Sequence, residues 1–355
     1  MATDTLQRPR PLLERSLDLS RVNGELLAYV LLFALSVVAH LWGLGVMGMH
    51  HDESVHAFPT WSLYMGRGGF TCANGASSPV YCYDPVYHGP TLYFFMLTSF
   101  FLFGDSELTA RLPMAVAGIL LVASAPLLRP YLGKRGALIA ALLLAFAPSL
   151  LYYTRFARHD AFMLLWQLWM VIGFLRFVDT GRGRWLSLLA AGAALAVATH
   201  EMYYILAFIF GLFVIIRALD ESRFSARLQL GLLIALGVCG ALIVVNPPIP
   251  VGQGLFFGDK AMLLAACLIL GLLIRRAWSP EPVLLPRLQA LWRDDRTSLW
   301  VALAVFWGLY ILFYSSFFAY PYGIIDGLYK GLSYWLGSQQ AYARGDQPWY
   351  YYFML

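Results

Sequence analysis

Long apolar runs recur along nearly the whole of this 355-residue chain, and they restrict its fold more than any other feature. A helix needs about 20 apolar residues to cross the hydrocarbon core of a bilayer. Charged residues make up only 13% of the chain, against roughly 25% in a typical soluble domain. We therefore predict an all-α integral membrane protein, a polytopic helical bundle with about nine or ten hydrophobic helices.

The expected organisation is a short cytoplasmic segment, 1–25, followed by a single transmembrane domain, 26–355. A long first outer loop, 48–110, is expected to carry helices next to the membrane. The apolar run at 349–355 predicts that the chain stops inside a further span of a longer parent protein. The complete spans are predicted at residues 26–47, 112–128, 136–152, 161–178, 185–199, 202–216, 228–245, 255–274 and 299–318.

The positions of Lys and Arg predict how the chain is oriented. One segment, 88–103, is apolar but short, and we interpret it as a re-entrant or interfacial helix. With that interpretation, 18 of the 25 Lys and Arg residues fall in cytoplasmic loops, as the positive-inside rule requires. The prediction is a multi-pass protein of the cell membrane with a cytoplasmic N-terminus. The net charge of +5 then belongs to these loops, which argues against a nucleic-acid partner.

This orientation places acidic residues and six of the seven histidines together on the outer face. Ionisable residues at a membrane are costly unless they are paired or functional, so a collection from several loops predicts a shared site. The residues concerned are Asp52, Glu53, Asp84, Asp105, Glu107, Asp160 and Glu201, with His50, His51, His56, His88, His159 and His200.

The individual candidates each have a simpler alternative. Asp52 and Glu53 follow the first span, where an Asp can serve as a general base, but acid pairs also begin solvated loops. Arg111 is either a phosphate partner or an interfacial residue that reaches toward water. His88 at a helix start could hold a phosphate or simply cap the helix. Arg158 and Asp160 follow the third span, and His200 and Glu201 lie at a bend that could equally be a polar turn.

Two cysteines, Cys72 and Cys82, lie in the first outer loop and are disulfide candidates, because that compartment permits oxidation. Cys239 and Cys267 lie within predicted spans, where we interpret them as small apolar residues.

The order of these motifs resembles the GT-C glycosyltransferases over roughly residues 26–217. It is similar to protein O-mannosyltransferases and lipid A aminoarabinose transferases, and closer still to the prokaryotic flippase-associated glycosylation membrane proteins. The matching motifs are Asp52-Glu53, His88-Gly89-Pro90, Arg111 in the run GDSELTARLP, and Asp160. Two positions depart from the pattern: Gly89 replaces a middle proline, and His159 stands where the transferases carry an aliphatic residue.

The resemblance implies an inverting glycosyltransferase that moves a sugar from a polyprenyl-phosphate donor to a hydroxyl on an acceptor protein or glycolipid, among membrane lipids. Asp52 would be the base, with Glu53 and Asp160 as further catalytic acids. His88, Arg111, Arg158, His200 and Glu201 would bind substrate or phosphate. No cofactor is required by this chemistry, although a divalent metal ion at Asp160 and Glu201 stays open. The alternatives are a non-catalytic flippase or transport component and a structural subunit of a membrane complex.

Overall fold

The computed structural model describes residues 23–72, 77–221, 234 and 283–334. The predictions for 1–22 and 349–355 lie outside these residues, as does the predicted span 255–274 and all but one residue of the predicted span 228–245. Within them the protein is an all-α membrane protein, as the apolar runs predict.

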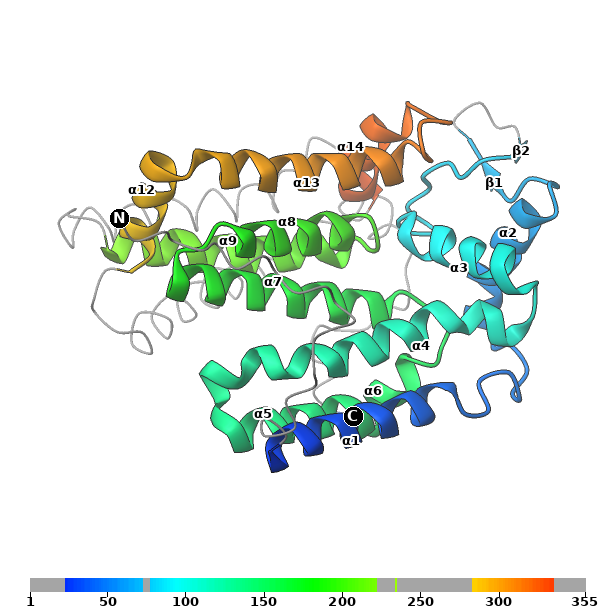
Figure 1. Cartoon of the computed structure of the whole chain (residues 1–355). Coiled ribbons are helices and arrows are strands. Elements are labelled where there is room, and N and C mark those ends of the chain that lie inside the picture. The colour runs from blue at the N-terminus through cyan, green and yellow to red at the C-terminus, as the bar shows by residue number, and fades with distance from the viewer. Residues whose placement is uncertain (1–22, 73–76, 222–233, 235–282, 335–355) are drawn as a thin grey trace, which may run out of the picture.

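Long helices lie side by side along one direction and form the body of the molecule (Figure 1). Their bounds agree with the predicted spans to within about seven residues. They are α1 (Gly24–Leu41), α4 (Glu107–Ser124), α5 (Arg129–Phe146) with the short α6 (Pro148–Tyr153), α7 (Asp160–Thr180), α8 (Arg184–Val197), α9 (Met202–Glu221) and α13 (Arg296–Tyr314).

Four described stretches are long and apolar enough to cross a membrane: 24–41, 107–146, 160–180 and 296–314. The second is two helices rather than one, because the chain turns back between α4 and α5 (Figure 1). The turn contains the 3-10 helix η3 (Ala125–Leu128) and Gly133, whose φ of 66° lies in the left-handed region that glycine adopts at little cost.

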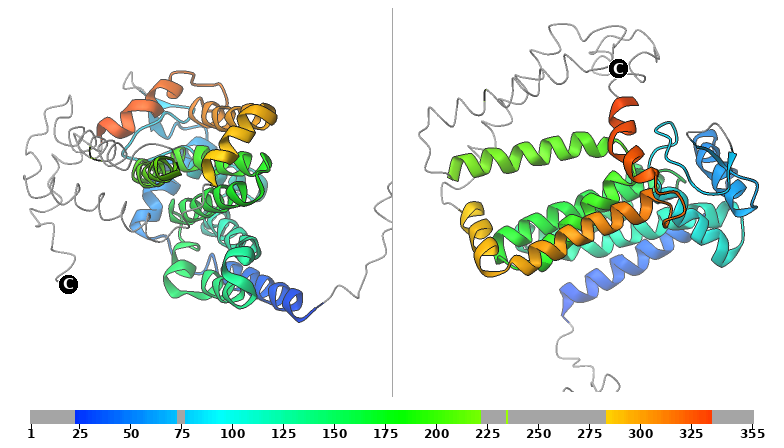
Figure 2. Two further views of the ribbon diagram at one scale, coloured as in Figure 1. Left: turned by 90° about the vertical axis from the view of Figure 1, so that its left-hand side faces the viewer. Right: turned by 90° about the horizontal axis from the view of Figure 1, so that it is seen from above.

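The two ends of the bundle carry different elements. At one end lie α2 (His51–Tyr64), the two-residue strands β1 (Phe70–Thr71) and β2 (Ser77–Ser78), α3 (Thr91–Phe103) and α14 (Gly323–Ser333), and at the other lies α12 (Leu284–Asp294). Figure 2 shows α2 and α12 at opposite ends in a second view. The strands pair antiparallel, and a disulfide joins Cys72 to Cys82 beside them, with their Cα atoms 5.3 Å apart. We call the end with α2 and α3 the loop end.

Helix α3 begins and ends at the loop end. Gly89, just before it, donates its N–H to Thr199 O at the end of α8, and Gly104, just after it, has its carbonyl bound by Thr109 of α4. The end of α1 also meets the start of α4, since Gly45 lies directly against Leu108. The 13 residues of α3 span only about 20 Å, less than the roughly 30 Å of a hydrocarbon core. This geometry supports the interpretation that 88–103 does not cross.

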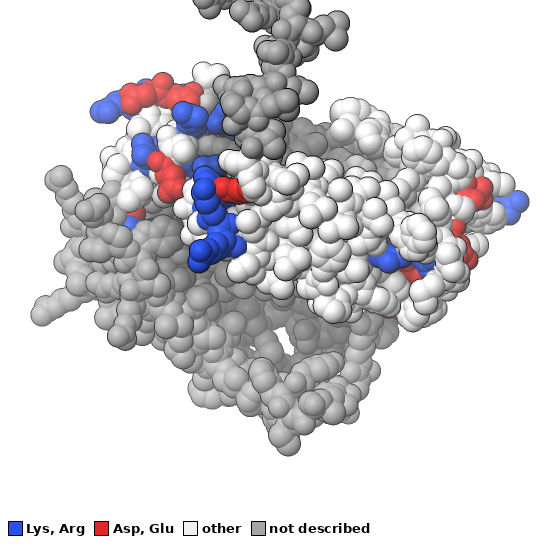
Figure 3. Space-filling view, turned by 60° about the horizontal axis from the view of Figure 1, so that its bottom comes forward, with Lys and Arg blue, Asp and Glu red and all other residues white. Residues whose placement is uncertain are grey.

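Charged residues concentrate toward the ends of the molecule. Figure 3 shows Lys, Arg, Asp and Glu at both ends of one face, with a broad uncharged belt between them. Such a belt is what lipid requires of the surface that it contacts.

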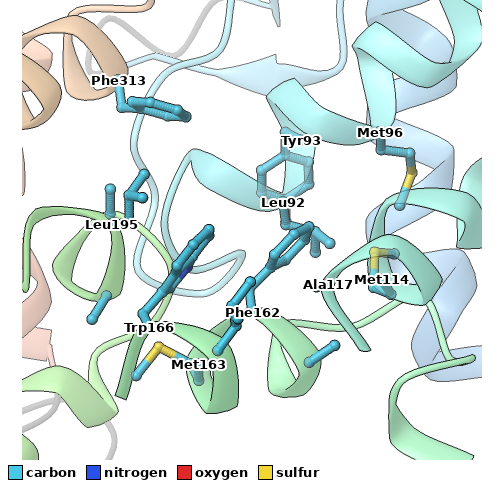
Figure 4. Packing of buried hydrophobic residues seen from close by; sticks show 14 of the residues in the cluster. Leu92, Tyr93, Met96, Met114, Ala117, Phe162, Met163, Trp166, Leu195 and Phe313 are labelled. Atoms are coloured by element: carbon cyan, nitrogen blue, oxygen red, sulfur yellow. The ribbon is translucent and has the colours of Figure 1, made fainter. Parts of the chain in front are cut away.

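The core lies between α3 and the long helices. Leu92, Tyr93 and Met96 of α3 are fully buried and face α4 and α7, as the close view shows (Figure 4). The labelled residues that pack with them are Met114, Ala117, Phe162, Met163, Trp166, Leu195 and Phe313. Because α3 is part of this core, the segments that flank it lie against the bundle.

Candidate functional site

Glu53 and Arg111 form a buried ion pair at the loop end. The guanidinium of Arg111 donates from Nε to Glu53 Oε1 at 2.7 Å and from Nη2 to Oε2 at 2.6 Å, a bidentate contact. Glu53 also accepts the backbone N–H groups of Ala157 and His50. The two side chains predicted as a catalytic acid and a phosphate ligand therefore bind each other.

Arg111 also fixes the linker between α1 and α2. Its remaining N–H groups donate to the carbonyls of Leu44, Met47 and Gly48, at 2.7 to 3.2 Å. His50 caps α2, because its ring nitrogen accepts the Asp52 N–H while Glu53 accepts the His50 N–H. This network joins α2, α4, the linker and the loop before α7, and it orients Asp52 on the first turn of α2.

Asp52 and Asp160 share one guanidinium. Arg158 Nη1 lies 3.2 Å from Asp52 Oδ2, and its Nε lies 3.6 Å from Asp160 Oδ2. Asp52 comes from the first turn of α2 and Asp160 from the first turn of α7. The structure thus brings together the two acids that the sequence predicted to cooperate, and it places a cation between them.

A histidine cluster lies next to this group, made of His56, His88, His159 and His200. The rings of His88 and His200 stack with centroids 4.1 Å apart, and His159 meets the edges of both. His56 packs against His159 at 4.5 Å and binds Tyr93 Oη through Nδ1. Burial, followed by the neighbouring His88, lowers the pKa of His56 to about 3 and of His200 to about 4, so both rings are neutral at neutral pH.

Glu201 binds the histidine cluster through His88. Its Oε2 lies 2.6 Å from His88 Nδ1, and its Oε1 accepts the hydroxyl of Tyr83. Burial raises the pKa of Glu201, but the contacts from His88 and His200 outweigh burial and leave the pKa below its usual value. Sequence analysis placed His88, His200 and Glu201 in one site, and the structure brings them together.

His88 is held in an unusual backbone conformation. Its φ of 66° lies in the left-handed region, which is uncommon for residues other than glycine and occurs often at functional sites. The hydroxyl of Tyr81 donates to its carbonyl at 2.7 Å. The ring is thereby aimed at Glu201 and His200.

The structure explains why Gly89 replaces the middle proline of the family pattern. A Cβ at Gly89 would lie 2.2 Å from Ala198 O and 2.8 Å from Thr199 N. Gly89 also donates its N–H to Thr199 O, which a proline could not do. The close approach of this segment to the end of α8 therefore requires glycine here.

Sequence reasoning placed His56 and His159 on the outer face but assigned them no role. It also missed the tyrosines Tyr83 and Tyr93 that orient the cluster. One signal was present, because His159 stands where the similar transferases carry an aliphatic residue. The contacts themselves depend on how α2, α3 and α7 pack, which no local pattern reveals.

A groove opens beside the Glu53–Arg111 pair at the loop end. Its volume is about 670 Å³, and it lies between the linker after α1 and the segment around α6. Most of its lining is apolar, including Leu44, Met47, Leu151 and Phe156, with the polar groups of His50 and Arg155 at one side.

We expect Glu53→Gln to destabilise the protein by about 3 kcal/mol or more, because it leaves the buried Arg111 without its counter-ion. Thermal unfolding in detergent measures the change. Arg129→Gln is the matched control, since it breaks the exposed pair with Glu25 and should have a much smaller effect. Equal losses in the two variants would contradict a central role for the buried pair.

The stability difference between the wild type and Glu53→Gln should depend on pH. Burial raises the pKa of Glu53, but the hydrogen bonds from Arg111, Ala157 and His50 outweigh it and hold the pKa below the ordinary 4.5. The contribution of an acid with a lowered folded pKa is present above its unfolded pKa and lost as pH falls through the folded value. The difference should be constant from pH 7 to about 4.5 and shrink below. A difference that grows on acidification would refute the assignment.

Comparison with known proteins supports a transferase. Residues 87–250 match the family model described as dolichyl-phosphate-mannose-protein mannosyltransferase, and this stretch includes His88, Arg111, Arg158, Asp160 and Glu201. No curated protein and no solved structure gives a significant match to the chain. Together with the apolar helices, this match supports a membrane glycosyltransferase of the GT-C type.

Proposed function

We propose that the chain transfers a sugar from a polyprenyl-phosphate donor to an acceptor hydroxyl on the non-cytoplasmic face, with inversion, and that Asp52 is the general base. One observation carries the proposal: the accessible carboxylate of Asp52 lies against the guanidinium of Arg158, which also lies close to Asp160. The resemblance to mannosyltransferases supports the reaction class.

Exposure separates the four acids of the site into two pairs. The side chains of Asp52 and Asp160 are 47% and 42% exposed, whereas those of Glu53 and Glu201 are 1% and 3% exposed. A general base must reach the hydroxyl that it deprotonates, within about 3 Å or through one water. Asp52 and Asp160 meet this requirement, and the two glutamates instead hold the surrounding loops.

The proposed reaction needs one base and one cation. Asp52 accepts the proton of the acceptor hydroxyl while that oxygen attacks the anomeric carbon from the face opposite the phosphate. The bond between the anomeric carbon and the phosphate oxygen breaks, and its electron pair leaves with the polyprenyl phosphate. Arg158, half-buried between Asp52 and Asp160, can stabilise the charge that develops on the phosphate. Asp160 then keeps Arg158 in position and orients the acceptor.

The apolar groove supports a lipid-borne donor. Its lining includes His50 and Glu53, which lie close to Asp52 in the sequence, and its apolar part suits a prenyl chain. Arg155 at its edge donates to Trp42 O at 2.6 Å and brings a second guanidinium close to the groove. Nucleotide sugars are made in the cytoplasm. A site on the other face of the membrane therefore fits a lipid-borne donor.

The competing function is a flippase or transport component without catalysis. Transporters place ionisable groups near the bilayer midplane, in broken helices. In the part of the chain that the structure describes, the acids and histidines discussed above gather at the loop end instead. This placement favours an enzyme.

Replacing Asp52 by Asn keeps the shape of the side chain but removes the base. Transfer of labelled mannose from polyprenyl-phosphate mannose, in membranes that supply the acceptor, should fall by about 10²-fold or more. Asp105→Asn is the control, because Asp105 is an exposed acid at the same end that binds the Trp61 ring nitrogen. Normal transfer by the Asp52 variant at normal expression would rule out Asp52 as the base.

The proposed orientation is tested by cysteine labelling in sealed cells. Arg67→Cys lies after α2 at the loop end, and Arg293→Cys lies in α12 at the opposite end; both positions are exposed. With Cys239 and Cys267 replaced by alanine, an impermeant maleimide should label Cys at 67 from outside and Cys at 293 only after the cells are opened. The reverse pattern would place the site in the cytoplasm.

A further inference from the structure

We propose that His88, His159 and His200 form a binding site for a transition-metal dication of the zinc type. One ligand atom from each of the three side chains lies within 4.8 Å of the others. They come from three separate segments: the residue before Gly89, the start of α7, and the turn between α8 and α9. The proposal is independent of the transfer reaction, because it rests on these imidazoles and not on Asp52.

His159 has a nitrogen that needs a partner. The residue is 2% exposed, and its Nε2 is buried without a hydrogen-bond partner among the described residues. A buried polar atom without a partner costs about 1–3 kcal/mol, so such atoms usually have a reason. A metal ion is a partner that a lone pair on this nitrogen can bind directly.

His88 has the arrangement of a metal-binding histidine. Its Nδ1 faces Glu201 Oε2 at 2.6 Å, which fixes that nitrogen as the N–H donor and leaves Nε2 with its lone pair. A carboxylate behind the ring orients a metal-binding imidazole and makes it more basic. The left-handed backbone of His88 maintains this orientation at a cost in strain.

The same carboxylate can serve His200. Glu201 Oε2 lies 3.8 Å from His200 Nδ1, which accepts the Met202 N–H. If a metal ion binds the other ring nitrogen of His200, Nδ1 carries the proton. The His200 ring must then turn so that Nδ1 donates to Glu201 instead of accepting the Met202 N–H. Nitrogen ligands of tetrahedral zinc lie about 3.3 Å from one another, so the stacked rings of His88 and His200 must tilt until both ligand atoms point at one ion.

The ligand set determines which metals fit. Imidazole nitrogen binds zinc, copper, nickel and cobalt well, whereas magnesium and calcium require oxygen ligands. Three protein ligands leave a fourth tetrahedral position open, as in catalytic rather than structural zinc sites. If the proposed function holds, that position would be available to a phosphate oxygen of the donor.

The experiment measures metal binding directly. Full-length protein in detergent is stripped with a chelator, dialysed against Zn²⁺ or Co²⁺, freed of loose metal and measured by mass spectrometry of the elements. One ion per chain is expected to remain. His159→Asn should abolish retention, and Glu201→Gln should weaken affinity by about 10–100-fold. The controls are His51→Asn, an exposed histidine, and His40→Asn, a buried histidine of α1 outside the cluster.

The Co²⁺ form of the wild type provides a readout that does not require any variant to fold. Its visible absorption should have the intensity of a tetrahedral, nitrogen-rich site. No retained ion in the wild type, the weak spectrum of an octahedral oxygen site, or equal retention by His159→Asn would each overturn the proposal. Metal retention uses no sugar donor, so its outcome is separate from that of the transfer assay.

Discussion

The ion pair between Glu53 and Arg111 is the interaction on which the loop end depends. Four segments meet at it: the linker after α1, the first turn of α2, α4, and the loop before α7. Both side chains are almost fully buried, and each of their polar groups has a partner, which offsets the cost of removing two charges from water. Because the pair fixes both α2 and the loop that carries Arg158, it also sets where Asp52 and Asp160 meet.

A second tie positions the histidines. The segment at Gly89 lies directly against the backbone of Ala198 and Thr199. The side chain of Thr91 adds a hydrogen bond to the carbonyl of Ala198. Since α3 is buried in the main core, this contact fixes where His88 lies relative to the bundle. His200 and Glu201 therefore lie between α8 and α9, and His88 lies shortly before α3.

The ionisable groups of the site are of two kinds, buried groups that hold the structure and accessible groups that could contact a substrate. Glu53 and Glu201 are buried and fully engaged, whereas Asp52, Asp160 and Arg158 remain accessible. The proposed glycosyl transfer needs a base, a cation and room for two substrates, and we assign the first two to Asp52 and Arg158 of this accessible group. The adjoining apolar groove is suited to a long lipid chain. The histidine cluster is not needed for this chemistry, which is why it calls for a separate explanation.

The sequence by itself determined the class of fold, the long apolar helices in the described residues, and which residues lie at the loop end. Apolar run length decides a membrane span because the bilayer thickness sets a fixed requirement, and Pro126, Pro130 and Gly133 mark the turn between α4 and α5. The predictions of Asp52, Asp160 and Arg158 as neighbours, and of His88 with Glu201, followed from the shared face and the motif order.

Only the tertiary structure decided which acid pairs with which cation. Glu53 and Asp52 are adjacent in sequence, yet helical geometry turns Glu53 toward Arg111 and Asp52 toward Arg158. The direction of a side chain depends on how distant helices pack, and that information is not contained in any local run of residues.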